Sequence, residues 1–438
     1  MHLYKMAHQN HVIQSMSSKP DSSSASGQSK SRIGLVLPGG GARGAYQVGV
    51  LKAMSEMLPR RAKNPFSVVS GTSAGAINAV VIASRAQLFH VGVAEMENVW
   101  RNFRSHHVFK CDSWTLMRNS ARWLLALLTG RMGDENPLSL LDNEPLRNML
   151  RKRINFAAIN KALDRGHVDA VAVTAAGYTS AQSVSFYQGA ENLGSWQRVR
   201  RNGRPAELNL DHLMASIAVP IVFPPVIIGR EYFGDGAMRQ ATPLSPAVHL
   251  GVDRIMVIGA RNEVHDPEPI ATENIPYPSL GRVAGYVLDA LFMDGLSADL
   301  ERLTRINLIL DQVSDRSITI DEGALRPIDA LVMLPSEDIR EIAERHVHEL
   351  PRPVRILLRG LGAMNKGNMQ LASYLLFESG YTRELIDLGY RDAMNRRAEI
   401  EAFLAGDAVD TPSRVSGWRD LIEEYTAKLP ILKLSGKE

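Results

Sequence analysis

Residues 66–77 read FSVVSGTSAGAI, and this stretch decides the fold. Its first half favours a short buried strand that ends at Ser70, and its alanine-rich second half favours a helix. Between them, GTSAG at residues 71–75 fits the G-x-S-x-G pattern, in which small residues allow a sharp turn that exposes the serine hydroxyl. The positive end of the following helix favours a developing negative charge. The pattern predicts Ser73 as a nucleophile, although an ordinary strand-to-helix turn explains these five residues alone equally well.

A second glycine-rich turn comes earlier in the chain. IGLVL at 33–37 predicts a buried strand, PGGGARG follows at 38–44, and apolar residues at helical spacing predict a helix over 45–58. The successive glycines can aim several backbone N–H groups at one negative oxygen, as an oxyanion hole requires. They also satisfy the G-x-G-x-x-G dinucleotide pattern. That alternative is disfavoured because the second strand ends at Ser70, without the acidic residue that binds ribose.

The order strand, helix, strand, helix predicts an α/β fold with a mainly parallel central sheet covered by helices. The other expected elements are strands at 169–175, 254–258 and 330–334, a hairpin over 226–233, and helices over 88–164, 280–310 and onward to the end.

We expect three parts along the chain. A disordered, serine-rich polar tail occupies 1–32, because it lacks the apolar residues that would repay its ordering. The catalytic domain is expected at 33–260. A helix-rich C-terminal extension at 261–438 is expected to pack on or beside that domain.

The composition is that of a globular protein, with 438 residues of which 45% are hydrophobic and 22% charged. The formal net charge is +3, and the first 32 residues carry all of it. The balanced body argues against nucleic acid as a partner. Basic residues cluster at 147–153 and 198–204. Solvated faces explain these clusters, with a headgroup or phosphate surface as the alternative.

Neither a metal nor a cofactor is expected. Cys111 is the single cysteine, and the nearby His106, His107 and Asp112 do not have the spacing of a zinc site.

No secretory signal and no run of about 18 apolar residues is present, so we expect a cytoplasmic protein without a membrane-spanning helix. The amphipathic stretch 114–128 favours a helix on the core, with contact to a lipid interface as the alternative.

A base for Ser73 is suggested by YFGDGA at 232–237, in which Asp235 follows a short strand. Taken alone, Asp-Gly indicates a hairpin turn. Alternatively, Asp235 is a base in direct contact with the serine hydroxyl. The competing arrangement is a Ser-Asp-His triad, for which His249 and His265 are the nearest histidines downstream of Asp235. A structural histidine explains His249 better.

Together these motifs resemble the patatin-like phospholipases, acyl hydrolases that use a Ser-Asp dyad without histidine. PGGGARG, GTSAG and GDGA occur in the family's order, and ASIAVPIVFP at 215–224 is similar to the family segment between the last two. LIDLGYRDA at 385–393 is similar to a segment of bacterial members, so we expect a bacterial member. Thr242 and Pro243 stand where many relatives carry Asn-Pro, which affects the support of the site rather than the dyad.

The resemblance implies a patatin-like three-layer fold with Ser73 as nucleophile and Asp235 as base. It also implies, around these two, an oxyanion hole of Gly39, Gly40, Gly41, Ala42, Arg43 and Gly44, an elbow of Gly71, Thr72, Ala74 and Gly75, and an aspartate loop with Gly236 and Ala237.

The implied reaction is two-step acyl transfer through a Ser73 acyl-enzyme, with no metal or cofactor. A lipid or other acyl ester is the expected substrate, and contact with a membrane surface is compatible with it. Two rival hypotheses are a lipid-binding or regulatory protein on the same fold and a dinucleotide-binding protein. The first is disfavoured because a pocket that only binds lipid needs neither the serine, the aspartate nor the glycine loop. Head group, chain length, hydrolase against transacylase and oligomeric state do not follow from the sequence.

Overall fold

The computed structural model describes residues 31–111, 139–190, 193–262, 277–312, 319–320, 323–364, 369–409, 411 and 414–417. From Ser31 onward these residues belong to one compact unit. The tail expected at 1–32 lies outside the described residues except for its last two, and the amphipathic stretch 114–128 lies wholly outside them.

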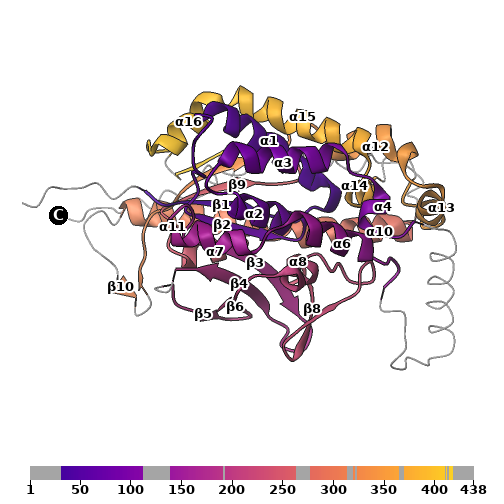
Figure 1. The fold of residues 1–438 in the computed structure, drawn as a ribbon, viewed down its shortest axis with the longest axis horizontal. Helices are drawn as coiled ribbons and strands as arrows, with labels where there is room; N and C mark the ends of the chain where they lie inside the picture. Colours follow the sequence, from indigo (N-terminus) through magenta and orange to yellow (C-terminus); the bar gives the residue numbers. More distant parts are fainter. Residues whose placement is uncertain are drawn as a thin grey trace, which may run out of the picture. The chain divides into compact units, whose positions relative to one another are not determined.

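A mixed sheet occupies the centre of this unit (Figure 1). Its parallel part has the order β13-β12-β9-β1-β2-β3. These strands are β1 (Ile33–Leu37), β2 (Val68–Thr72), β3 (Ala170–Gly177), β9 (Arg254–Ile258), β12 (Asp329–Met333) and β13 (Val415–Ser416). Every residue of β1, β2, β3 and β9 is buried, which explains why these strands read as apolar runs rather than as alternating patterns.

Beyond β3 the sheet becomes mostly antiparallel. The strands are β4 (Ser183–Gly189), β5 (Trp196–Arg198), β6 (Arg201–Pro205), β7 (Val226–Ile228) and β8 (Glu231–Asp235). Both β4 and β8 pair antiparallel with β3, and β7 and β8 form the predicted hairpin. The pairing of β8 with the end of β3 brings Asp235 beside Ala175, close to the end of β2.

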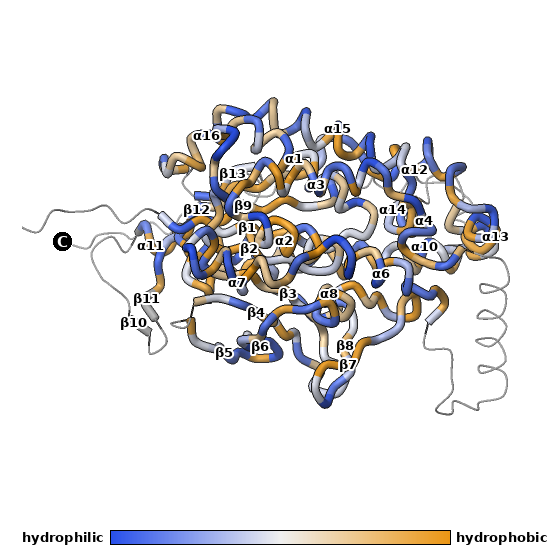
Figure 2. Tube along the Cα trace, in the orientation of Figure 1, coloured by the Kyte–Doolittle hydropathy of each residue, from blue (hydrophilic) through white to orange (hydrophobic). Residues whose placement is uncertain are grey.

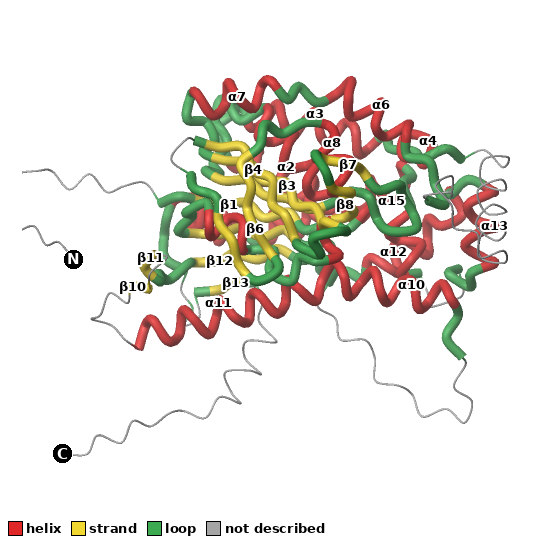
Figure 3. Tube along the Cα trace, turned by 90° about the horizontal axis from the view of Figure 1, so that it is seen from below, coloured by secondary structure: helices red, strands yellow, loops and turns green. Residues whose placement is uncertain are grey.

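Helices lie on both sides of the sheet, with α10 and α11 along one side and α3, α6 and α7 along the other (Figure 3). The α-helices are α1 (Ala45–Met57), α2 (Ala74–Ser84), α3 (Phe89–Arg101), α4 (Ser105–Val108), α6 (Glu144–Arg153), α7 (Ala157–Asp164), α8 (Leu210–Ser216), α9 (Ser245–His249), α10 (Leu280–Asp289), α11 (Gly295–Gln312), α12 (Ile339–His346), α13 (Arg352–Gly360), α14 (Gln370–Leu375), α15 (Ser379–Asn395) and α16 (Arg397–Ala405). A π-helical segment, Ala290–Asp294, joins α10 to α11, and the short strands Thr319–Ile320 and Gly323–Ala324 pair with each other. The predicted fold, a mainly parallel sheet covered by helices, is confirmed.

The hydropathy of the chain follows this layering. Figure 2 shows apolar residues concentrated along the central strands and α2, and hydrophilic residues on the outer helices. One continuous core of buried apolar side chains therefore joins the sheet to both helical layers. Among the described residues, no helix is long and apolar enough to cross a membrane.

The residues after 260 do more than cover the sheet. They add β12 and β13 to it, in parallel pairing with β9 and with each other. α15 packs along α1 and α3, and α14 packs on α10 and on the 3-10 turn Gly41–Gly44. The glycine loop therefore lies against the C-terminal part of the chain, while the division of domains at residue 260 stays a prediction.

Candidate active site

Ser73 occupies a sharp turn between β2 and α2. Its backbone has φ 54° and ψ −128°, a conformation that is strained in a residue with a side chain. The flanking glycines make the turn possible because a Cβ atom on Gly71 would lie 2.3 Å from the carbonyl oxygen of Gly75. A Cβ atom on Gly75 would lie 2.0 Å from the carbonyl oxygen of Leu37 in β1. The geometry of residues 71–75 is thus that of a nucleophile elbow.

Asp235 is the carboxyl group beside Ser73. It ends β8 and only 1% of its surface is exposed. Its Oδ1 atom accepts a 2.9 Å hydrogen bond from the N–H of Ala237, whereas Oδ2 makes no fully formed hydrogen bond with any described residue. Burial raises the pKa of Asp235 to about 7, and the hydroxyl of Ser73 and the N–H of Ala237 limit the rise. The buried, unengaged oxygen can therefore accept a proton near neutral pH.

The side chain of Ser216 bonds to the backbone of the elbow. The N–H of Ser73 donates a 2.9 Å hydrogen bond to Ser216 Oγ, and the Ser216 hydroxyl donates a 2.6 Å bond to the carbonyl oxygen of Thr174 in β3. The N–H of Asp235 donates to the carbonyl oxygen of Ala218, at 2.8 Å. The segment ASIAVP thus contacts both members of the expected dyad, a role that its sequence did not reveal.

The glycine loop lies over the serine. A Cβ atom on Gly39 would lie 2.9 Å from Ser73 Cβ, and Gly41 has a positive φ of 55°. A Cβ atom on Gly41 would also lie 2.4 Å from the carbonyl oxygen of Tyr374, so the loop packs tightly on α14. The N–H groups of Gly39 and Gly40 donate no backbone hydrogen bond to any described residue.

Arg43 ties this loop to the C-terminal helices. Its guanidinium is buried and donates to Asp289 Oδ1 (3.1 Å), to the Tyr374 hydroxyl (3.1 Å) and to Ser373 Oγ (2.7 and 3.0 Å). It also stacks on the Tyr374 ring, 3.8 Å from the ring centre. Since all of these partners lie beyond residue 260, sequence motifs alone could not find them.

His249 takes part in other contacts. It lies on α9, where its ring stacks on Trp196 and Nδ1 donates to the carbonyl oxygen of Ser245 at 2.8 Å. These contacts fit the interpretation of His249 as a structural residue. Within the described residues, no three His, Cys, Asp or Glu side chains are placed to hold a metal ion. Asp112, which belongs to the cluster around Cys111, lies outside the described residues.

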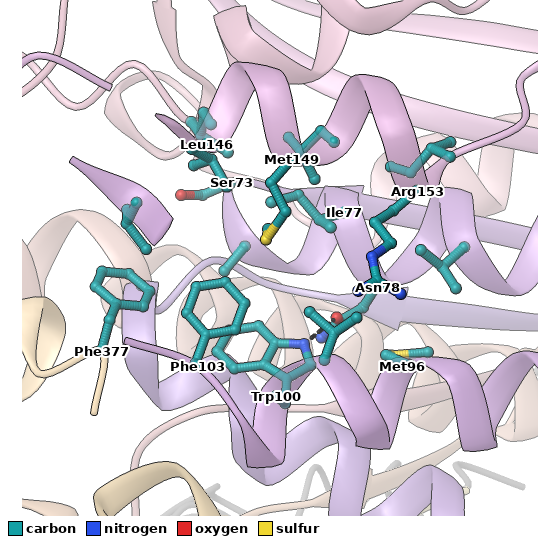
Figure 4. A pocket seen from close by; sticks show the side chains of 18 of the residues that line it. Ser73, Ile77, Asn78, Met96, Trp100, Phe103, Leu146, Met149, Arg153 and Phe377 are labelled. Carbon is teal, nitrogen blue, oxygen red and sulfur yellow. Dashed lines mark hydrogen bonds between the residues drawn. The ribbon is translucent and has the colours of Figure 1, made fainter. Parts of the chain in front are cut away.

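A cavity of about 360 Å³ opens beside Ser73 (Figure 4). Its walls are mostly apolar side chains, which come from α2, α3, α6 and the segments that follow α3, α8 and α14. They include Ile77, Met96, Trp100, Phe103, Met149 and Phe377. A buried hydrogen bond from Trp100 Nε1 to Asn78 Oδ1 (3.0 Å) fixes two of the walls against each other. None of these positions carries a motif, because the helices that supply them meet only in the fold.

The fold and the site together define an α/β protein in which a nucleophile-elbow serine, a buried aspartate and a glycine loop meet at an apolar cavity. Residues 35–248 match the family described as patatin-like phospholipase. The chain therefore carries a domain of this family, as its motifs predicted.

Two curated relatives are similar to this chain in sequence. Calcium-independent phospholipase A2-gamma of Oryctolagus cuniculus is 23% identical over 354 residues, which are 76% of this chain and 41% of the relative. Lysophospholipase nte1 of Aspergillus terreus is 48% identical over 56 residues, which are 13% of this chain and 3% of the relative. The chain thus spans less than half the length of these relatives. The expected bacterial origin stays a prediction.

Solved structures resemble the chain more distantly. A human GIVD cytosolic phospholipase A2 in complex with methyl gamma-linolenyl fluorophosphonate is 12% identical, with a TM-score of 0.42. The match covers 86% of this chain and 59% of that one.

Proposed function

We propose that the protein is a lipid acyl hydrolase in which Ser73 is the nucleophile and Asp235 is its base. The observation that carries the proposal is the position of Asp235, whose buried, unengaged Oδ2 lies beside a serine held in a strained turn at the mouth of an apolar cavity. The family domain and the phospholipase names of the relatives support lipid esters as the substrate class.

In the first step, Ser73 Oγ attacks the ester carbonyl and its proton passes to Asp235 Oδ2. The carbonyl oxygen becomes negative and accepts hydrogen bonds from N–H groups of the glycine loop, with Gly39 and Gly40 as the main donors. The ester C–O bond then breaks, the proton on Asp235 passes to the departing alcohol, and the acyl group stays on Ser73.

In the second step, a water molecule attacks the acyl-enzyme. Asp235 accepts the water proton, the same N–H groups hold the oxyanion, and the fatty acid leaves as Ser73 recovers its proton from Asp235. An aspartate is a weak base when it is solvated. Burial raises the pKa of Asp235 to about 7, which makes it a suitable general base near neutral pH. Arg43 holds the loop and takes no proton.

The substrate enters with its acyl chain in the cavity. Apolar walls stabilise a long hydrocarbon chain by removing it from water. The alcohol part of the ester stays outside the cavity, which allows phospholipid and lysophospholipid head groups alike. We assign the protein to the cytoplasm, where it acts on lipid dispersions or at a membrane surface.

The test is a lipid profile. A mixed lipid extract is incubated with the wild-type protein and with Ser73→Ala, and the released fatty acids are measured by mass spectrometry. We expect fatty acids with the wild type and background release with Ser73→Ala, while Ser84→Ala, further along the same helix, retains the wild-type release. A folded wild-type protein that binds lipid but releases no fatty acid would support the lipid-binding rival instead.

A further inference from the structure

The cavity beside Ser73 has two chemically different ends. Ser73, Ile77, Val81 and Arg85 line it and follow one another at four-residue intervals along one face of α2. At a rise of 1.5 Å per residue, this wall extends roughly 18 Å from the serine to the arginine. The cavity is therefore long enough to have a distal end that the ester group does not reach.

The side walls run in the same direction. Figure 4 shows Leu146 near Ser73, Met149 beyond it and Arg153 at the far end, all from α6. On the opposite wall, Phe103 and Met96 are ordered likewise, with Met96 towards Arg153. An acyl chain that starts at Ser73 thus passes apolar side chains and arrives at a guanidinium.

Positive charge exceeds negative charge at that end. Of the four charged residues that line the cavity, Arg85 and Glu95 pair with each other at 2.9 Å. Lys152 and Arg153 pair with no carboxylate among the described residues. The distal end therefore carries two solvent-exposed cations whose charges the lining residues do not balance.

The position of these cations at the end of α6 has an ordinary explanation, because cations are favoured at helix C-termini. For Arg151 that explanation is sufficient. It belongs to the same basic run, but it bonds Asn148 at 2.9 Å and does not line the cavity. Arg153, by contrast, is exposed to solvent but also lines the cavity, and Figure 4 draws it at the end away from Ser73.

We propose that Lys152 and Arg153 form a subsite for an anion at the end of the ligand's hydrocarbon chain, and that the preferred acyl groups end in a carboxylate. The inference rests on the proposed acyl hydrolase function. A chain ended by a methyl group gains nothing from the guanidinium, which is exposed to solvent, whereas a terminal carboxylate forms a charge-assisted pair with it. The ester bond next to Ser73 is the one that breaks, and the distal carboxylate is unchanged by the reaction.

Two matched esters test the substrate preference, 4-nitrophenyl dodecanoate and the 4-nitrophenyl monoester of dodecanedioic acid. The measured quantity is the ratio of kcat/KM for the diacid ester to that for the dodecanoate. We expect this ratio to fall roughly tenfold in Arg153→Gln, mainly through KM, and to be largely restored in Arg153→Lys. Arg151→Gln is the matched control, since it removes the same charge from the same helix outside the cavity, and it should keep the wild-type ratio.

The outcomes separate this inference from the proposed function. An equal ratio in the wild type and Arg153→Gln, with Ser73-dependent hydrolysis of both esters, overturns the subsite and leaves the hydrolase intact. An equal fall in Arg151→Gln also overturns it, because the effect would then be long-range attraction. Loss of all Ser73 dependence overturns the proposed function itself.

A carboxylate on a hydrocarbon chain has a second source, the fatty acid product bound in the reverse direction. Inhibition of a short ester, 4-nitrophenyl butyrate, by dodecanoate distinguishes the two sources. If Arg153→Gln weakens this inhibition and leaves the ester ratio unchanged, the subsite binds free fatty acid and the proposed substrate preference is wrong. If the ester ratio falls, the preference stands whatever the inhibition shows.

Discussion

The backbone N–H of Ser73 donates a 2.9 Å hydrogen bond to the hydroxyl oxygen of Ser216, which lies 143 residues further along the chain. The Ser216 hydroxyl in turn donates to the carbonyl oxygen of Thr174. The strained turn is thus anchored to the centre of the sheet through the side chain of Ser216, which does not line the cavity.

The first prediction concerns this anchor. Ser216→Ala leaves the N–H of Ser73 and the carbonyl oxygen of Thr174 buried without partners, so the free energy of unfolding should fall by about 1–3 kcal/mol. We also expect kcat to fall by about tenfold or more, because the turn can relax. Urea unfolding and ester hydrolysis measure the two effects. Ser55→Ala, at the far end of α1, should leave kcat unchanged, and a Ser216→Ala protein with normal kcat would refute the anchoring role.

A second prediction concerns the glycines of the elbow. Gly75→Ala places a methyl group 2.0 Å from the carbonyl oxygen of Leu37. Leu37 belongs to the buried strand β1, which cannot move away to relieve this clash. We expect the free energy of unfolding to fall by about 1–3 kcal/mol or more, together with most of the activity. Gly360→Ala is the control, because nothing lies within 4 Å of its added methyl group. Similar thermal unfolding of the two variants would contradict the packing argument.

The third prediction is the dependence on pH. The proposed base works as a carboxylate, so kcat/KM should rise with pH through about 7 and level off above it. Stability should change in the opposite direction. Because burial raises the pKa of Asp235 in the folded state, the folded protein holds a proton that the unfolded chain has lost between about pH 4 and 7, and stability falls as pH rises through that window.

Asp235→Asn removes both effects. Its kcat should fall by about 10²–10⁴-fold, and its stability relative to the wild type should increase as pH rises from 4 to above 7. Chemical denaturation at several pH values measures the second effect independently of activity. Asp169→Asn, which changes a half-buried aspartate paired with Arg32, should retain the wild-type kcat. If the difference in unfolding free energy between Asp235→Asn and the wild type does not change with pH, Asp235 is ionised as easily in the folded protein as in the unfolded chain.

The fourth prediction concerns the tie between Arg43 and Asp289. Arg43→Gln leaves the buried Asp289 carboxylate with Arg261, 3.9 Å away, as its remaining charge partner. We expect the free energy of unfolding to fall by up to about 3–5 kcal/mol, the range for a buried carboxylate that loses its partner entirely. In Arg43→Lys the charge remains but the fork of hydrogen bonds to Ser373 and Asp289 is lost. We therefore expect a partial recovery of stability with a kcat still below that of the wild type. Equal kcat in Arg43→Lys and the wild type would mean that the loop keeps its position without the fork.

The local motifs were predictable because each has a backbone requirement of its own. The buried strands β1, β2, β3 and β9 read as apolar runs, and the glycines around Ser73 fit only a sharp turn. The strand β6, RNGRP, was not predicted because Asn202-Gly203 is a typical turn signal. In the fold the Trp196 ring covers Gly203, and a Cβ atom there would lie 2.3 Å from it. A tertiary contact thus overrides the local preference.

The surroundings of the dyad could not be read from the sequence for a different reason. Arg43 meets its partners Asp289 and Tyr374 across 246 and 331 residues. The cavity likewise combines faces of α2, α3 and α6, each of which by itself is indistinguishable from an ordinary core-facing helix. Family resemblance supplies the expected roles of Ser73 and Asp235, but the depth and charge of the cavity follow only from how these helices pack.

If Ser73 forms the covalent acyl intermediate, a fluorophosphonate with a long alkyl chain should react with its hydroxyl group. The wild-type protein is incubated with this probe, digested, and mapped by mass spectrometry. We predict a single adduct on the peptide that contains Ser73, and no adduct in Ser73→Ala shown to be folded by circular dichroism. Labelling of a different residue in the wild type, or equal labelling of the folded Ser73→Ala variant, would contradict the account.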